Sequence, residues 1–240
     1  MHYRLDRKYM IRLIRILVAF ICFVMILVIF DESDSSMIGL EKNKERALVK
    51  KKVKKKQSFK VLEQNPDVIG MIHIPGSEVY PVLLGSDNYY YLTHNEKKEK
   101  TSAGSISADC AYQDTNIRQQ FLRHTIIYGH NMKDGSMFHQ LVSYKKKKYF
   151  KKHPYIEFDN LVMKGKWRVF SVYVIDGNEE SIMRKFDNDS EFAEYLTRIK
   201  NRSKYAVDIQ LNQDSKILTL CTSSEESDNA KTIIHAVLVK

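Results

Sequence analysis

Residues 219–223 read Thr-Leu-Cys-Thr-Ser and lie between two runs of β-type residues near the carboxyl end of the chain. A Tyr-Gly-His-Asn turn occupies residues 128–131, far upstream. Together they predict that the imidazole of His130 is brought across a fold to a nucleophile at position 223. A cysteine there would form a thiolate, because a neighbouring imidazolium lowers the pKa of a thiol. The residue is Ser223.

Several motifs carry a resemblance to a known family. Thr219, Leu220, Thr222 and position 223 fit a T-L-x-T-C signature, with serine where the signature has cysteine. Other matches follow in the family's order and spacing: N-P-D-V-I-G-M-I-H-I-P-G at 65–76, Y-P-V-L at 80–83, G-S-D-N-Y-Y-Y-L at 85–92, A-G-S-I-S-A-D at 103–109, T-I-I-Y-G-H-N-M at 125–132 and M-F-H-Q-L at 137–141. Through them residues 57–240 resemble sortases, the transpeptidases that join surface proteins to the Gram-positive cell wall. A helix inserted before the strand that bears the nucleophile resembles class B.

The resemblance implies a mainly β fold, a sortase-like eight-stranded β-barrel with inserted and N-terminal helices. It implies catalytic roles for His130, for Ser223 at the position of the family's cysteine, and for Lys231 at the position of the family's arginine. Both replacements lower the expected rate. A hydroxyl needs a stronger base than a thiol does, and an ammonium lacks the planar donor fork with which a guanidinium can hold an oxyanion.

The same resemblance implies a substrate groove. Asn88 and Leu92 would lie on the wall of this groove and Ile182 beside it, with plain core packing as the alternative for the two apolar residues. The implied reaction cleaves an Asn-Pro-x-Thr sorting signal after Thr, holds it as an acyl-enzyme, and passes it to an amine without a cofactor. The expected partners are surface proteins with C-terminal sorting signals and a peptidoglycan precursor or wall-peptide amine.

Cys221 leaves the identity of the nucleophile open. Residues two apart in a strand point to the same face, so Cys221 shares a side with Ser223 and could substitute for it. Otherwise Cys221 is a small apolar residue that lines the groove. A deliberate Cys-to-Ser replacement would explain Ser223 but not Lys231, which favours natural divergence.

Short β-rich runs dominate the second part of the chain and predict a barrel or sandwich. They lie at residues 68–74, 79–84, 125–128, 167–175, 216–221 and 232–239. One insertion is predicted to be a helix, because Phe192, Tyr195, Leu196 and Ile199 recur at helical spacing. Asp189 and Ser190 are the capping candidates. The apolar stripe of this helix should pack on the barrel.

The residues before this domain divide into three expected segments. They are a cytoplasmic tail at 1–9, a transmembrane anchor at 10–30 and a Lys-rich stalk at 31–56. Basic residues precede the apolar run and acidic residues follow it, which predicts an amino terminus inside the cell. A cleaved signal peptide is the alternative. The expected localisation is therefore the cell membrane, with a single pass through residues 10–30 and an extracellular catalytic domain.

Charge is distributed unevenly. The first 60 residues hold 15 of the 39 Lys and Arg and 6 of the 29 Asp and Glu, so they carry +9 of the net +10. The nearly balanced remainder argues against nucleic-acid binding, and no histidine pair has metal-ligand spacing. The stalk lysines predict a solvated spacer, with attraction to anionic lipid or wall polymers as the alternative.

Three functions remain open at this point. The first is a class B sortase-like transpeptidase. The second is a degenerate homologue that binds sorting signals or pilin partners without efficient turnover. The third is a stalk-driven wall or lipid binder whose domain serves as a platform.

Overall fold

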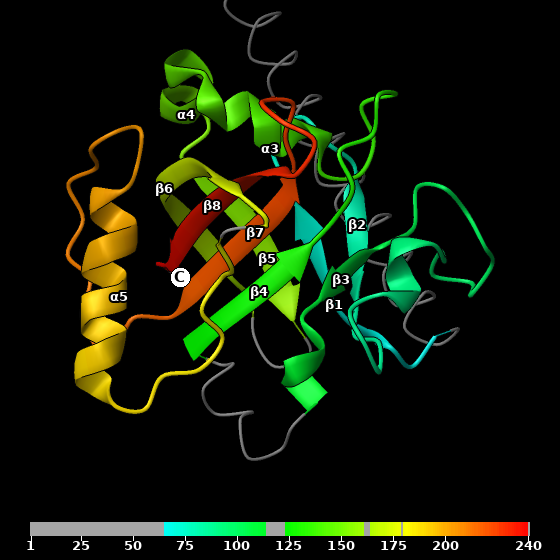
Figure 1. The fold of residues 1–240 in the computed structure, drawn as a ribbon, viewed down its shortest axis with the longest axis horizontal. Helices are drawn as coiled ribbons and strands as arrows, with labels where there is room; N and C mark the ends of the chain where they lie inside the picture. The colour runs from blue at the N-terminus through cyan, green and yellow to red at the C-terminus, as the bar shows by residue number, and fades with distance from the viewer. Residues whose placement is uncertain (1–64, 114–122, 161–163, 179, 240) are drawn as a thin grey trace, which may run out of the picture. The chain divides into compact units, whose positions relative to one another are not determined.

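The computed structural model describes residues 65–113, 123–160, 164–178 and 180–239, which belong to one compact unit, Gln57–Lys240. Within these residues eight strands close a barrel in the order β1-β2-β3-β4-β7-β8-β6-β5 (Figure 1). The strands are β1 Val68–His73, β2 Val79–Leu83, β3 Ile106–Ala108, β4 His124–Tyr128, β5 Tyr155–Asn160, β6 Lys166–Asp176, β7 Ile217–Ser223 and β8 Ala230–Leu238. The predicted mainly β, eight-stranded barrel is confirmed.

The helices of the described residues are short. They are η1 Tyr90–Leu92, η2 Cys110–Gln113, α3 His139–Val142, η3 Ser143–Lys145, α4 Lys147–Lys152 and α5 Asp189–Asn201. None of these described helices has the length and apolar composition needed to cross a membrane. That finding contradicts the single-pass membrane localisation expected above. The expected segments at 1–9, 10–30 and 31–56, and any N-terminal helix before residue 65, lie outside the described residues.

Strand β7 lies between β4 and β8 in the barrel and joins distant parts of the sequence. It pairs in parallel with β4, which places Tyr128 opposite Cys221, and antiparallel with β8, which places Ser223 opposite Lys231. Its side chains alternate between the two faces of the sheet. Leu218 and Leu220 enter the main core of the barrel. The alternate residues of the strand, Thr219, Cys221 and Ser223, therefore face outward. The carboxyl ends of β4 and β7 therefore lie side by side.

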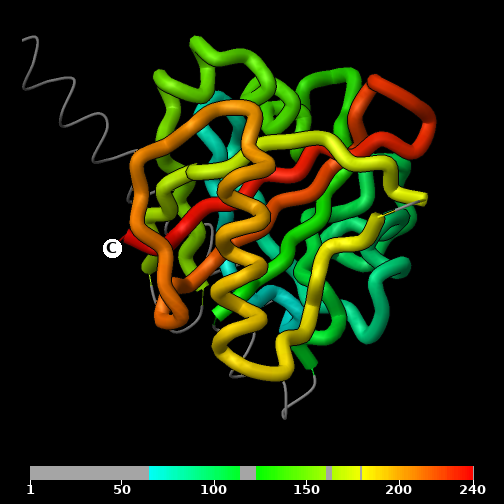
Figure 2. Tube along the Cα trace, turned by 60° about the vertical axis from the view of Figure 1, so that its left-hand side comes forward, coloured from blue at the N-terminus to red at the C-terminus, as the bar shows by residue number. Residues whose placement is uncertain are grey.

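Helix α5 lies on the outside of the barrel, over β7 and β8 (Figure 2). Its buried residues are the four predicted from helical spacing, Phe192, Tyr195, Leu196 and Ile199. They pack with Phe170 of β6, Ile217 of β7 and Val237 of β8. The helix begins one residue earlier than the capping candidates suggested, because the side chain of Asn188 accepts a hydrogen bond from the Glu191 N–H at 2.9 Å.

Two strands were absent from the sequence prediction. Strand β3 has three residues and pairs in parallel with β2 and antiparallel with β4, so that tertiary context rather than local pattern defines it. Strand β5 alternates exposed and buried side chains, with Ile156 and Phe158 facing the core. That alternation is visible in the sequence and is typical of a half-buried strand.

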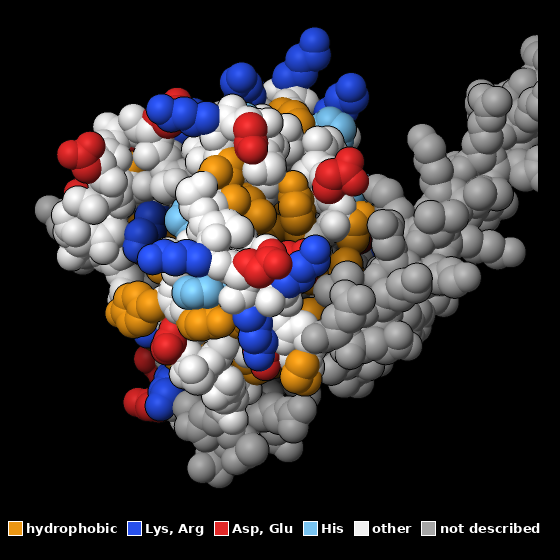
Figure 3. Space-filling model, turned by 90° about the vertical axis from the view of Figure 1, so that its right-hand side faces the viewer, with side chains coloured by type: hydrophobic (Ala, Val, Ile, Leu, Met, Phe, Trp, Pro, Cys, Tyr) orange, Lys and Arg blue, Asp and Glu red, His pale blue; other side chains and the backbone are white. Residues whose placement is uncertain are grey.

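Most of the face shown in Figure 3 mixes acidic and basic side chains, while Lys and Arg side chains project from its upper edge. Helix α4 and the residue before it carry a local lysine cluster that the charge count did not reveal. Its exposed members are Lys146, Lys147, Lys148, Lys151 and Lys152. None of them forms an ion pair among the described residues. The domain therefore has one strongly basic helix although its net charge is close to zero.

A chain of buried polar groups crosses the outer face of β7. Thr219 Oγ1 lies 2.7 Å from His124 Nε2 and 2.7 Å from His235 Nδ1. His235 Nε2 lies 2.8 Å from the Tyr173 hydroxyl. Both histidines are buried, and His124 Nδ1 has no hydrogen-bond partner among the described atoms. An orphaned nitrogen is tolerated more easily as an acceptor than as a donor or a cation, so the neutral Nε2–H form of His124 fits best.

These histidines predict that the fold loses stability in acid. Burial lowers the pKa of His124 to about 3, and burial together with the charge of Arg202 lowers that of His235. As the pH falls, the unfolded chain therefore binds protons at these two histidines before the folded chain does. Stability should be constant above about pH 6.5 and fall below it by about 1.4 kcal/mol per pH unit per histidine. Urea unfolding from about pH 8 to about pH 5 checks this, and a pH-independent midpoint would contradict it.

Candidate active site

A pocket with a cavity volume of about 430 Å³ opens where β4 and β7 end. Five segments line it: residues 88–92 around η1, the end of β4, the end of β7, the start of β8, and the end of β6 with the β6–α5 loop, which is residues 177–188 without the undescribed residue 179. The structure brings all seven residues predicted from the sequence into this lining. They are His130, Ser223, Lys231, Cys221, Asn88, Leu92 and Ile182.

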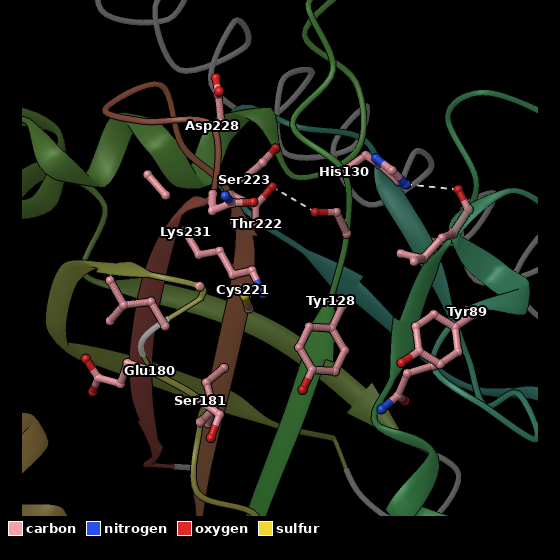
Figure 4. A pocket seen from close by; sticks show the side chains of 18 of the residues that line it. Tyr89, Tyr128, His130, Glu180, Ser181, Cys221, Thr222, Ser223, Asp228 and Lys231 are labelled. Carbon is pink, nitrogen blue, oxygen red and sulfur yellow. Dashed lines mark hydrogen bonds between the residues drawn. The ribbon is translucent and has the colours of Figure 1, made fainter.

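His130 follows Gly129 at the tip of β4 and is half-buried. Two hydrogen bonds fix the turn, because Gly129 N–H donates to the Cys221 carbonyl at 3.2 Å and the Thr222 hydroxyl donates to the Gly129 carbonyl at 2.7 Å. His130 Nε2 lies 2.9 Å from the Leu92 carbonyl oxygen (Figure 4). A carbonyl only accepts, so Nε2 carries a hydrogen and the lone pair of the neutral ring lies on Nδ1.

Ser223 is the last residue of β7 and is exposed at the same end of the pocket as His130 (Figure 4). Its carbonyl accepts a hydrogen bond from Asn131 Nδ2 at 3.3 Å. Asn131 is itself oriented by His139, whose Nδ1 lies 2.9 Å from Asn131 Oδ1. The tips of β4 and β7 are therefore tied together just beyond the two predicted catalytic side chains.

Lys231 stands opposite Ser223 on β8, but its side chain extends along the pocket toward Cys221 (Figure 4). Gly177 makes room for it, since a Cβ there would lie 2.7 Å from Lys231 Cε. Lys231 forms no ion pair with a described carboxylate. A positive charge is thus present in the pocket, on a flexible stem rather than a rigid fork.

Cys221 lies deeper than Ser223 and is buried. It packs with Ile175, Ile233 and Ile182, so Ile182 combines core packing with a place on the pocket wall. Burial raises the pKa of the Cys221 thiol to about 11, against the opposing effect of the Lys231 charge. A thiol that holds its proton is a poor nucleophile, and this environment weighs against Cys221 as the substitute.

The side chain of Asn88 is held at one wall of the pocket. Its Oδ1 accepts a hydrogen bond from the Cys110 N–H at 2.7 Å, and its Nδ2 lies 3.4 Å from Asp109 Oδ2. Leu92 is half-buried on the same wall. Asn88 and Leu92 therefore combine a fixed polar group with an apolar surface, as a peptide groove requires.

Sequence reasoning missed three further residues of this region. Tyr128 and Arg184 line the pocket, and Asp109 lies buried behind it in contact with both. Tyr128 and Asp109 stood within motifs already quoted, whereas Arg184 lies in a loop with no local pattern.

The described residues contain no group of three or more His, Cys, Asp or Glu that could hold a metal ion.

Comparisons with known proteins decide the family. Sortase B of Listeria monocytogenes is 38% identical over 169 residues, which cover 70% of this chain and 67% of the relative. Sortase B of Staphylococcus aureus is 34% identical over 179 residues, covering 73% of this chain and 72% of the relative. The chain belongs to the sortase B family.

The fold agrees with this membership. The crystal structure of Clostridium perfringens sortase B superposes with a TM-score of 0.69 at 31% identity and covers 75% of this chain and 98% of that one. No protein-family model matches the chain. The family and the fold are therefore those of the sortase-type transpeptidases.

Proposed function

We propose that this chain is a class B sortase-like transpeptidase that binds an Asn-Pro-x-Thr type sorting signal and forms an acyl-enzyme on Ser223. The observation that carries this proposal is the convergence on one pocket of three side chains from separate segments: His130 from the turn after β4, Ser223 from the end of β7 and Lys231 from the start of β8. Base, nucleophile and cation are the three components that acyl transfer needs.

The proposed reaction follows from the chemistry of these groups. Ser223 Oγ attacks the threonine carbonyl carbon of the sorting signal while His130 Nδ1 takes the hydroxyl proton. Lys231 balances the negative charge on the carbonyl oxygen. The peptide bond after threonine breaks, and the released amine receives the proton from His130. An incoming amine then attacks the Ser223 ester, and Ser223 recovers its proton as the new amide forms.

The contact between His130 and Leu92 supports this use of the imidazole. Because the Leu92 carbonyl holds the Nε2–H, the Nδ1 lone pair stays available as the base. The carbonyl would act as the orienting third group that Ser and Cys acyltransferases share. Leu92 would thus connect the groove wall to the base.

The proposed partners follow from the reaction. Surface proteins with C-terminal sorting signals would donate the acyl group, and a peptidoglycan precursor or wall-peptide amine would accept it. The reaction requires no cofactor.

A cleavage assay tests the proposal. The protein should cleave an Asn-Pro-x-Thr peptide slowly, and added amine should convert the hydrolysis product into an amide. Ser223→Ala should abolish both products, since it removes the attacking oxygen. Cleavage that persists in Ser223→Ala would assign the activity elsewhere, and a scrambled peptide is the control for specificity.

Recognition without efficient turnover is the second candidate, and two observations favour it. Lys231 extends beside Cys221 rather than Ser223, and in the described part of the chain the side-chain hydrogen bond of His130 goes to the Leu92 carbonyl and not to the Ser223 hydroxyl. Calorimetry should then show saturable peptide binding. The affinity should fall about tenfold in Leu92→Ala, because that variant loses free energy from the burial of a leucine side chain of about the size that a tenfold change requires. Binding that is lost at high salt, or on deletion of residues 42–56, would instead support the stalk-driven binder.

A further inference from the structure

Asp109 is a fully buried carboxylate that the proposed reaction does not use. It follows β3 and is fixed to the barrel by its backbone, since its N–H donates to the Ile126 carbonyl at 3.0 Å. Its Oδ1 accepts the Ala111 N–H at 3.1 Å. A buried carboxylate must have charged or hydrogen-bonding partners, so the other contacts of Asp109 are those that satisfy its oxygens inside the protein.

Three walls of the pocket supply these partners. The Tyr128 hydroxyl, from β4, donates to Asp109 Oδ2 at 2.8 Å. Arg184 Nε, from the β6–α5 loop, lies 2.8 Å from the same oxygen. Asn88 Nδ2, from the segment before η1, lies 3.4 Å from it. Tyr128, Arg184 and Asn88 all line the pocket, so one buried oxygen links three separate segments of its lining.

The electrostatics of the cluster agree with this arrangement. Burial, with the charge of Asp109, raises the pKa of Tyr128, which keeps the phenol protonated as a donor. The hydrogen bond with Tyr128 raises the pKa of the Arg184 guanidinium. The side chain of Arg184 is 50% exposed while that of Asp109 is 1% exposed, so the loop residue supplies from the surface the charge that the buried carboxylate needs.

The β6–α5 loop has a second tether that touches none of these groups. Glu180 forms an ion pair with Arg202, the residue that caps the C-terminus of α5. Arg202 does not line the pocket, and it lies over the ring of Tyr173. The two ion pairs hold the same loop, but only one of them also holds Asn88 and Tyr128. This difference provides a matched control.

We propose that Asp109 is a positioning residue that sets the spacing of Asn88, Tyr128 and Arg184 around the bound peptide. The role rests on the proposed function, because it concerns the affinity of the same pocket for a sorting signal. Asp109 does not touch the peptide and acts through the three side chains that it holds. Its charge is the essential property, since a neutral amide of the same shape would leave the Arg184 guanidinium without a charged partner and would turn its NH2 donor toward the Ala111 N–H.

Peptide affinity separates this role from simple stabilisation. Asp109→Asn should weaken the Kd for an Asn-Pro-x-Thr peptide by about tenfold or more, the factor expected when hydrogen bonds to a charged group are lost. Arg202→Gln should leave the Kd within about twofold even where it lowers Tm, because Arg202 does not line the pocket and its removal leaves the three contacts of Asp109 in place. In a Ser223→Cys background, Asp109→Asn should raise KM with little change in kcat, the pattern of lost uniform binding.

Limited trypsin digestion tests the positioning without any peptide. Trypsin cuts after Arg184 and Lys185, and release of Arg184 from Asp109 should expose this site. Cleavage between residues 184 and 186 should be faster in Asp109→Asn than in the unaltered protein, by about tenfold. Arg202→Gln should show a smaller increase.

The two measurements distinguish the possible failures. If the unaltered protein binds no sorting peptide, the proposed function is wrong, while the digestion still decides whether Asp109 holds the loop. If Asp109→Asn and Arg202→Gln weaken the Kd and accelerate cleavage equally, Asp109 only stabilises the fold and the proposal is overturned. The same conclusion follows if Asp109→Asn lowers Tm but leaves both the Kd and the cleavage rate unchanged.

Discussion

Ser223→Cys is expected to raise the rate of peptide cleavage by roughly tenfold or more, because a thiolate is a better nucleophile than a hydroxyl and a thioester a better acyl donor than an ester. His130 stands at the same end of the pocket as Ser223, and its Nδ1 is free to take the thiol proton. Initial rates on several Asn-Pro-x-Thr peptides measure the effect.

Adding Lys231→Arg should raise the rate again. A guanidinium can donate two parallel hydrogen bonds to a carbonyl oxygen, and loss of such donors typically costs about a hundred- to a thousandfold in rate. Lys231→Gln in the same background is the control, since it keeps a polar side chain without charge and should not help. Absence of turnover in both the single and the double variant would show that the groove itself has diverged, and the enzyme proposal would fail.

Gly104→Ala should cause the largest loss of stability and should also disturb the site. Gly104 has φ +55°, and a Cβ there would lie 2.4 Å from the Leu92 carbonyl oxygen and 2.6 Å from the Tyr91 oxygen. The Leu92 carbonyl is the group that holds His130. The left-handed backbone and the clash together should cost about 2–5 kcal/mol, measured by urea unfolding.

Gly135→Ala is the matched control for this variant. Gly135 has φ +86°, so alanine is strained there too, but no atom lies within 4 Å of the added Cβ. It should cost about 1–2 kcal/mol from the backbone alone. If Gly104→Ala loses more unfolding free energy than Gly135→Ala, the difference measures the steric clash with Leu92. Weaker peptide cleavage per folded molecule would show that the clash also displaces the Leu92 carbonyl. Equal losses at the two glycines would remove the steric argument.

Local sequence patterns predicted much of the barrel. The runs that became β1, β2, β4, β6, β7 and β8 have strong β-type composition, and the period of α5 is visible in four apolar residues. Strand β3 could not be found this way, because three residues carry too little pattern and pairing with β2 and β4 defines it. The alternation of Ile156 and Phe158 in β5 was available and was missed.

The candidate site was predictable wherever its residues follow from strand geometry. Cys221 and Ser223 lie on one face because they are two apart in β7, and His130 lines the same pocket because β4 runs parallel to β7. The depth of Cys221, which decides its pKa, depends on packing against Ile182 and was not visible in the sequence. The pair of Asp109 and Arg184 joins a strand end to a distant loop, and no periodicity indicates such a contact.

Intact mass spectrometry after incubation with an Asn-Pro-x-Thr peptide tests the central claim most directly. The account predicts a mass increase equal to the peptide acyl group cleaved after threonine, mapped by fragmentation to Ser223 and removed by hydroxylamine as an ester is. Ser223→Ala should lose this adduct while Cys221→Ala retains it. An adduct on Cys221, or none on the unaltered protein or its Ser223→Cys variant under conditions where the peptide binds, would contradict the account.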